Sequence, residues 1–253
     1  MRRRLIDLSC ASLLLAVVAT RVQANPGVAL RWNHCYGEET GLIIRSFACD
    51  TNVGQEVLVG WFVLPYDLDQ VSGNEIVVDL ATSFGYAYSP IPGPSVPIPE
   101  WWRFMRAGSC RQNALSWSTM DPDNQVCQDW GAGQASGFVA AYQLDTYGTG
   151  TARILMVSAV PTDGVQSLSA GSEYHSFTIR IRHDKTAGEG ACGGCDVPLG
   201  IIFNSVNVTT ALNANNTKLY GPVNGTDAHY VLWKPAVVPT LKTSWGAVKA
   251  LFR

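Results

Sequence analysis

The sequence contains few charged residues and no long apolar run. Charged residues make up 15 % of its 253 residues, and the formal net charge is −2. No block of like charge stands out, so the basic face that a nucleic-acid-binding protein needs is missing. No segment reaches the roughly 20 consecutive apolar residues of a membrane-spanning helix. We therefore expect neither a nucleic-acid partner nor a transmembrane helix.

The chain also lacks the short motifs that mark several enzyme classes and metal sites. It has no Gly-x-Ser-x-Gly turn, no HExxH helix and no EF-hand calcium loop. A zinc site built on Cys192 and Cys195 would need further ligands, and no second CxxC is present. These absences favour a non-catalytic protein that holds neither metal nor cofactor.

Residues 1–24 have the pattern of a secretory signal peptide. Three consecutive arginines supply a positive start, residues 8–19 are mostly apolar, and residues 22–24 offer a cleavage site after Ala24. Cleavage there would remove Cys10 and leave six cysteines. Export predicts a secreted protein, located outside the cell, at its surface or in a periplasm. In such an oxidising compartment we expect the cysteines to form disulfides.

The remaining cysteines are Cys35, Cys49, Cys110, Cys127, Cys192 and Cys195. Proximity along the sequence favours the pairs 35–49, 110–127 and 192–195. The Cys192-Gly-Gly-Cys195 spacing is also that of a thioredoxin-like redox pair. A glycine-rich turn precedes this motif and a strand-like segment follows it. These flanks favour a structural disulfide in a hairpin loop over a redox pair or a metal site.

Apolar residues alternate with polar ones in many segments, which predicts a mostly β fold. Residues 74–80 and 172–183 show this period most clearly, and residues 151–160 are apolar on both faces, as in a central strand. Further strands are expected at 28–33, 41–48, 55–64, 137–143, 198–210 and 229–234. We predict an all-β protein, an antiparallel β-sandwich that spans residues 25–234.

The sandwich pattern is interrupted over residues 85–136, which we interpret as a long loop excursion stapled by disulfides. Five prolines lie within residues 90–99, and proline cannot donate to a sheet ladder. Aromatic residues in this excursion are the expected ligand-binding side chains, because exposed rings stack well on sugars. The alternative is a small satellite core under the loop. The candidates are Trp101 and Trp102 first, then Trp117, Tyr86 and Tyr88.

Two histidines lie near the ends of the strand at 172–183. His175 and His183 share the period of Phe177 and its apolar neighbours, so we expect them on the inward face of that strand. A catalytic role for either is the alternative interpretation.

The C-terminal residues 235–253 change in character. Residues 235–240 form a proline-flanked linker, and apolar residues then recur at helical spacing through Phe252. This pattern predicts a short amphipathic helix. We expect the tail of residues 241–253 to dock to a partner or to sorting machinery.

Two segments carry a resemblance to known proteins. The run from Leu168 to Ile181, which follows the apolar segment 152–160, resembles the later half of cohesin-type and related carbohydrate-binding β-sandwiches of secreted bacterial proteins. Residues 53–60 are similar to the opening strand of those domains. The resemblance implies a jelly-roll-like sandwich and an extracellular setting, and it implies no site residue. The tail resembles the detachable C-terminal sorting tails of some secreted bacterial proteins.

These patterns support three expectations about function. The first is a secreted, non-catalytic binding or surface-structural module, with a polysaccharide or a cell-surface component as partner. The second is an extracellular glycan-directed hydrolase that uses carboxylates from loops. The third is a thiol–disulfide protein that uses Cys192 and Cys195.

Overall fold

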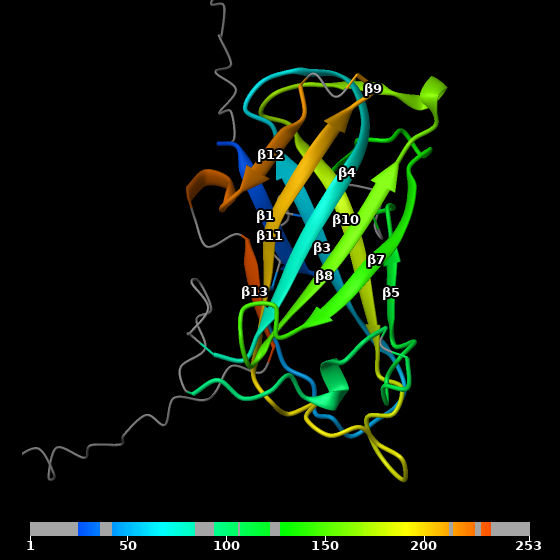
Figure 1. The fold of residues 1–253 in the computed structure, drawn as a ribbon, viewed down its shortest axis with the longest axis vertical. Coiled ribbons are helices and arrows are strands. Elements are labelled where there is room, and N and C mark those ends of the chain that lie inside the picture. The colour runs from blue at the N-terminus through cyan, green and yellow to red at the C-terminus, as the bar shows by residue number, and fades with distance from the viewer. Residues whose placement is uncertain are drawn as a thin grey trace, which may run out of the picture.

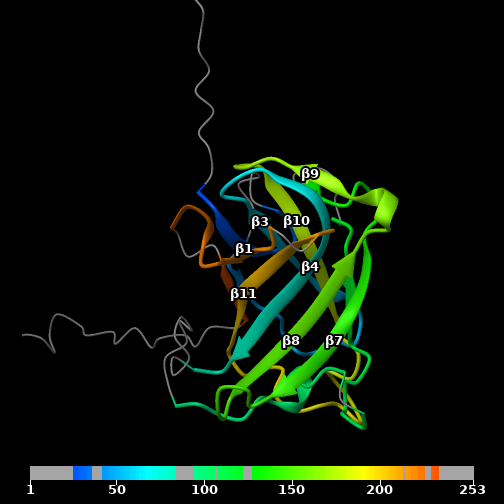
Figure 2. The same ribbon diagram turned by 45° about the horizontal axis from the view of Figure 1, so that its top comes forward.

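Two β-sheets packed face to face form the body of the protein (Figure 1). The computed structural model describes residues 25–35, 42–83, 94–105, 107–121, 127–212, 215–225 and 229–233. Figure 2 shows the two layers after a turn about the horizontal axis, with β4, β8 and β7 in front of β3 and β10. The mostly β prediction and the two-sheet sandwich are confirmed.

The first sheet has five strands in the order β1-β3-β10-β5, with β6 paired to β10. Neighbouring strands are antiparallel except β6, which runs parallel to β10. The strands are β1 (Gly27–Trp32), β3 (Gln55–Val63), β5 (Leu115–Ser118), β6 (Gln128–Asp129) and β10 (Glu173–Arg182).

The second sheet has eight strands in the order β2-β13-β11-β4-β8-β7, with β12 paired to β11 and β9 paired to β4. Only the β2–β13 pair is parallel in this sheet. The strands are β2 (Ile44–Arg45), β4 (Leu68–Ala81), β7 (Ser136–Leu144), β8 (Thr151–Ala159), β9 (Gln166–Leu168), β11 (Leu199–Thr210), β12 (Thr217–Tyr220) and β13 (Tyr230–Trp233). Three short 3-10 helices complete the described structure, at Glu100–Trp102 (η1), Thr162–Gly164 (η2) and Val223–Gly225 (η3).

The core lies between the sheets and is built by the alternating residues that the sequence indicated. Ile76 and Val78 on β4 and Phe177 on β10 are all buried. Phe203 comes from the opposite sheet. Its ring and that of Phe177 pack in an edge-to-face arrangement, with 5.0 Å between the centroids. Gly60 on β3 makes this packing possible, because a Cβ at that position would lie 2.4 Å from the Phe177 ring.

Most expected strands are present, and the differences have simple causes. Of the expected strand at 41–48, only Ile44–Arg45 forms one. Within the expected loop excursion 85–136, β5 and β6 return to the first sheet and pair with β10. At four and two residues, both are too short to show a clear alternation in the sequence. Tyr86, Tyr88, the signal segment 1–24 and the expected C-terminal helix lie outside the described residues.

A second, smaller apolar cluster covers the outer face of the first sheet. Its members are Ala29, Cys35, Val59, Trp61, Val63 and Val223. The pairing of β10 with β3 shifts register between His175 and Phe177, so His175 lies opposite Trp61 on this outer face. The prediction that His175 shares the inward face of Phe177 is therefore wrong, because an irregularity in the strand changes the side on which it lies.

All six cysteines form disulfides, as predicted, but the predicted partners are wrong. The bonds join Cys35 to Cys127, Cys49 to Cys195, and Cys110 to Cys192. They link residues 92, 146 and 82 positions apart in the sequence. Sequence proximity failed because the fold brings distant loops together. Cys192 and Cys195 are bonded to different partners, so the motif is not a redox disulfide.

Within the described ranges, no helix is long and apolar enough to cross a membrane. The same residues hold no group of three or more His, Cys, Asp or Glu side chains arranged to bind a metal ion. Three disulfides are typical of proteins that fold in an oxidising environment.

Candidate functional site

Trp101 and Trp102, the aromatic residues that the sequence placed first for ligand binding, are fully buried. They lie on η1, below the lower ends of the strands (Figure 1). The ring of Trp101 stacks on that of Trp233 with 5.3 Å between centroids, and its Nε1 donates to Thr186 Oγ1 at 2.9 Å. Rings enclosed in this way have no face left for a sugar. Their position matches the alternative expectation, a small apolar core under the loop, because η1 folds back to close the end of the sandwich.

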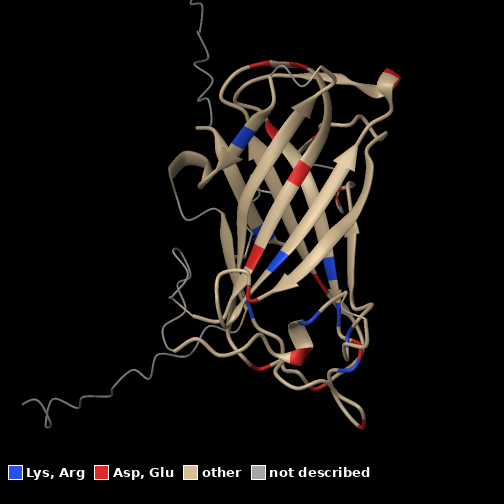
Figure 3. Ribbon diagram, viewed as in Figure 1, with Lys and Arg blue, Asp and Glu red and all other residues tan. Residues whose placement is uncertain are grey.

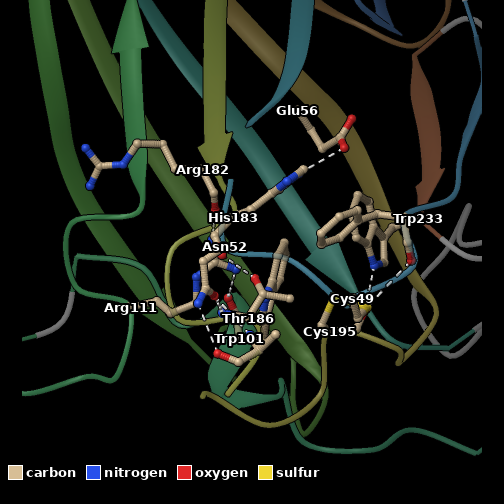
Figure 4. Close-up of a disulfide and its surroundings, with 12 residues drawn as sticks. Cys49, Asn52, Glu56, Trp101, Arg111, Arg182, His183, Thr186, Cys195 and Trp233 are labelled. Atoms are coloured by element: carbon tan, nitrogen blue, oxygen red, sulfur yellow. Dashed lines mark hydrogen bonds and ion pairs between the residues drawn. A yellow bond between two sulfur atoms is a disulfide. The ribbon is translucent and has the colours of Figure 1, made fainter. Parts of the chain in front are cut away.

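The end of the sandwich near η1 is tightly cross-linked (Figure 4). The imidazole of His183 stacks on Phe47 at 3.8 Å between centroids, and its Nε2 lies 3.0 Å from Glu56 Oε1. Asn52 Oδ1 accepts hydrogen bonds from the backbone N–H groups of Thr186 and Ala187. With the Cys49–Cys195 disulfide nearby, these contacts fix the loop geometry, and His183 has the position of a structural histidine.

Of the three predicted aromatic residues that the structure describes, Trp117 is the one at an accessible position. It lies on β5, the edge strand of the first sheet, opposite Ile179 of β10. The side chain is half-buried, and its Nε1 has no hydrogen-bond partner among the described residues. The Nε1 atom is itself buried, so the part of this side chain that a ligand can meet is the ring.

Trp117 forms one wall of a groove between β5 and β7, the edge strands of the two sheets. The groove has a volume of about 220 Å³. A hydrogen bond from Thr119 Oγ1 to the carbonyl of Ala135, 2.8 Å long, ties its two sides together. The lining residues are Trp117, Ser118, Thr119, Met120, Asp129, Gly133, Ala135, Ser136 and Gly137. We call this feature the edge groove.

Gly137 sets how closely the Trp117 ring approaches β7. A Cβ at this position would lie 2.5 Å from Cη2 of Trp117 and 2.0 Å from the carbonyl oxygen of Val157. Either distance is far below a van der Waals contact, so only glycine allows the indole to lie against the strand. The ring therefore packs directly against the backbone of β7 at Gly137.

Asp129 places a fixed carboxylate in the edge groove. Its Oδ1 accepts from the N–H of Gly131 at 2.9 Å, and its Oδ2 accepts from the N–H of Gly133 at 2.6 Å. These bonds orient the carboxylate without neutralising it. Across the groove, Met120 exposes 68 % of its surface and offers an adaptable apolar contact.

His175 supports the groove from behind. Its Nε2 lies 3.0 Å from Thr178 Oγ1, and that hydroxyl donates to the carbonyl of Met120 at 2.9 Å. Burial lowers the pKa of His175, while the charges of Asp121 and Asp129 act in the opposite direction. The chain of hydrogen bonds from His175 fixes the backbone at Met120, so we assign this histidine a positioning role.

The chemistry available in the edge groove suits binding. One aromatic ring, one carboxylate and several hydroxyl and backbone groups converge on it, as in sites that orient a polar ligand. Among its described lining residues, Asp129 is the one carboxylate, whereas glycoside hydrolysis uses a facing pair. Sequence reasoning missed Met120 and Asp129. The Asp-x-Gly-x-Gly spacing at 129–133 was the available signal, because it is typical of a turn closed by an aspartate.

Comparison of the chain with protein-family models, with curated proteins and with solved structures gave no match.

Proposed function

We propose that this protein is a secreted, non-catalytic binding module whose ligand is a carbohydrate held in the edge groove against Trp117. The observation that carries the proposal is the groove itself. A half-buried indole ring and a carboxylate fixed by two backbone N–H groups both line a volume of about 220 Å³. Sugars present both an apolar ring face and hydroxyl groups, and this pairing of an aromatic ring with polar acceptors matches both.

The rest of the molecule supports the same proposal. Three disulfides that link distant loops are typical of a protein exported to an oxidising compartment. The antiparallel pairing of β3 with β10 and of β4 with β11 is that of a β-sandwich, the architecture of many extracellular binding modules. We include in the proposal a jelly-roll-like strand path, as the resemblance to cohesin-type sandwiches implies.

The test is a binding assay of the oxidised protein on a panel of soluble and insoluble polysaccharides. We expect Trp117→Ala to weaken binding by roughly 30-fold, because a central aromatic contact commonly carries about 2 kcal/mol of affinity. Met120→Ala, at an exposed position, should weaken binding without a cost in stability. Tyr220→Ala, at a residue that is 73 % exposed on β12, serves as the control and should bind normally.

Two results would overturn the proposal. Absence of binding to every polysaccharide would remove the carbohydrate function. Full binding by folded Trp117→Ala and Met120→Ala proteins would place the ligand elsewhere on the surface.

A further inference from the structure

A second cavity lies at the other end of β5, and its charge is predominantly positive. It has a volume of about 240 Å³ and is lined by residues 109–114 together with Arg182, Asp184 and Lys185. Arg111 is among the lining residues, so three cations face a single carboxylate in the described part of the wall. Figure 3 shows Lys and Arg in the loops around this end of the sandwich.

Arg111 is a buried cation without a carboxylate partner within ion-pair distance among the described residues. It is 2 % exposed, and its guanidinium lies 3.6 Å from the centre of the Trp101 ring. Its terminal nitrogens donate to the backbone carbonyls of Trp101 and Arg182. Its Nε, which is buried, has no hydrogen-bond partner in the part of the chain that the structure describes. The guanidinium is held firmly while its charge is left without a direct counter-charge, which is costly in a buried position.

The positive charge around Arg111 is only partly compensated by the neighbouring carboxylate. Burial lowers the pKa of Arg111 to about 10; Asp184 acts in the opposite direction, and the neighbouring charge of Arg182 lowers the pKa further. Arg111 therefore remains protonated at neutral pH. Asp184 is paired with Arg182 Nε at 2.8 Å, and both side chains are about half exposed. An exposed ion pair of this kind is weak, so an anionic ligand can compete with Asp184 for Arg182.

The backbone around the cavity is held in place before any ligand arrives. Lys185 has a left-handed conformation with φ of 56°, and its carbonyl accepts from the N–H of Cys192 at 2.8 Å. Cys192 is in turn bonded to Cys110, at the far side of the cavity wall. A disulfide and a hydrogen bond thus fix the distance between the two loops that carry the cations. Preorganised donors bind charged groups without a large ordering cost.

We infer that this cavity binds an oxyanion, the carboxylate or sulfate group of an acidic polysaccharide, between Arg111, Arg182 and Lys185. Arg182 and Lys185 are exposed and can donate to the group, while the charge of Arg111, whose terminal nitrogens already donate to carbonyls, adds attraction at short range. Ala114 borders the cavity and Trp117 borders the edge groove, and a strand rise of about 3.4 Å per residue separates them by about 10 Å. The two sites therefore border neighbouring segments of the chain, just before β5 and within it. The choice of a polysaccharide as carrier rests on the proposed function.

The experiment measures binding of three soluble probes to the oxidised protein at low ionic strength. Polygalacturonate supplies carboxylates, dextran sulfate supplies sulfates, and dextran is neutral. We expect at least one acidic probe to bind more tightly than dextran, with an affinity that falls as salt is added. The tighter of the two acidic probes identifies the preferred group.

Matched variants separate a specific site from general charge attraction. The combination Arg182→Gln with Lys185→Gln should weaken binding of the acidic probe by about tenfold, since each lost contact is a charge-assisted hydrogen bond. Arg182→Lys keeps the charge and should restore part of the affinity. Lys218→Gln removes the same charge as Lys185→Gln from an exposed position on β12 and should leave binding unchanged.

Several outcomes would overturn the inference. These are equal binding of dextran and both acidic probes, no binding of either acidic probe, or equal losses in Lys185→Gln and Lys218→Gln. Tighter binding of a DNA duplex than of the acidic polysaccharides would overturn the assigned class of ligand. Trp117→Ala separates the two proposals: retained acidic binding in this variant would contradict the edge groove and leave the anion site in place.

Discussion

The indole of Trp101 lies nearly parallel to that of Trp233, with 5.3 Å between ring centroids and 24° between planes. Trp233 ends β13, the last described strand, so this stack joins η1 to the eight-stranded sheet. Arg111 covers the Trp101 ring at 3.6 Å. Trp101 is therefore the residue on which the closed end of the sandwich and the cationic cavity both depend.

Truncation of this ring should destabilise the fold without removing a ligand contact in the edge groove. We expect Trp101→Ala to lower the free energy of unfolding by about 3–5 kcal/mol, the usual cost of deleting a buried aromatic side chain. Trp101→Phe should cost less, mainly the hydrogen bond from Nε1 to Thr186 Oγ1. Urea denaturation followed by circular dichroism measures both, with Tyr220→Ala as the exposed control. A Trp101→Ala protein as stable as this control would contradict the packing described.

The stability of the fold should fall as the pH drops below about 6.5, because burial lowers the pKa of His175 from its ordinary value of 6.5. Over the interval between that value and the lowered one, the unfolded chain binds a proton that the folded protein does not. Stability then decreases with falling pH by up to about 1.4 kcal/mol per unit and levels off below the folded-state pKa.

The contribution of His175 is measured as a difference between two proteins. Urea denaturation of the wild type and of His175→Gln, above and below pH 6.5, separates this residue from the other titrating groups. Glutamine retains a donor for Thr178 and carries no titrating group. We expect the wild type to lose stability relative to the variant on acidification. Parallel pH profiles would refute the assignment.

Peptide mapping without a reducing agent should recover three cross-linked peptides, which join Cys35 to Cys127, Cys49 to Cys195, and Cys110 to Cys192. Removal of the last bond by the paired change Cys110→Ser and Cys192→Ser should cost about 4.5 kcal/mol, on the chain-entropy model for a loop of 82 residues. Mass spectrometry and urea denaturation check the two expectations. A peptide in which Cys192 is bonded to Cys195 would contradict the structure.

The strands could be predicted from the sequence where apolar and polar residues alternate regularly, because that pattern fits only a β-strand with one face in the core. The alternation on β4 and β10 requires a buried and a less buried face, so the pattern was sufficient to locate both strands. It failed at His175, because a shift of register reverses the side of a residue and leaves no mark in composition. It also failed at β5 and β6, which have four and two residues and depend on pairing with β10.

The candidate site was harder to predict because it depends on contacts between distant segments. The aromatic character of Trp101, Trp102 and Trp117 is the same in the sequence, and tertiary packing alone separates two buried rings from one at a groove. Asp129 and Arg111 gave no comparable signal. Their roles arise from turns and loops that only the assembled sheets bring together.

The connectivity of the disulfides determines what a single proteolytic cut does to the protein. Every peptide bond between Cys35 and Cys195 lies inside at least one loop closed by a disulfide. A protease that cuts one bond anywhere in this range leaves two pieces that remain covalently joined. Both sheets and both walls of the edge groove then remain parts of one covalently connected molecule after the cut.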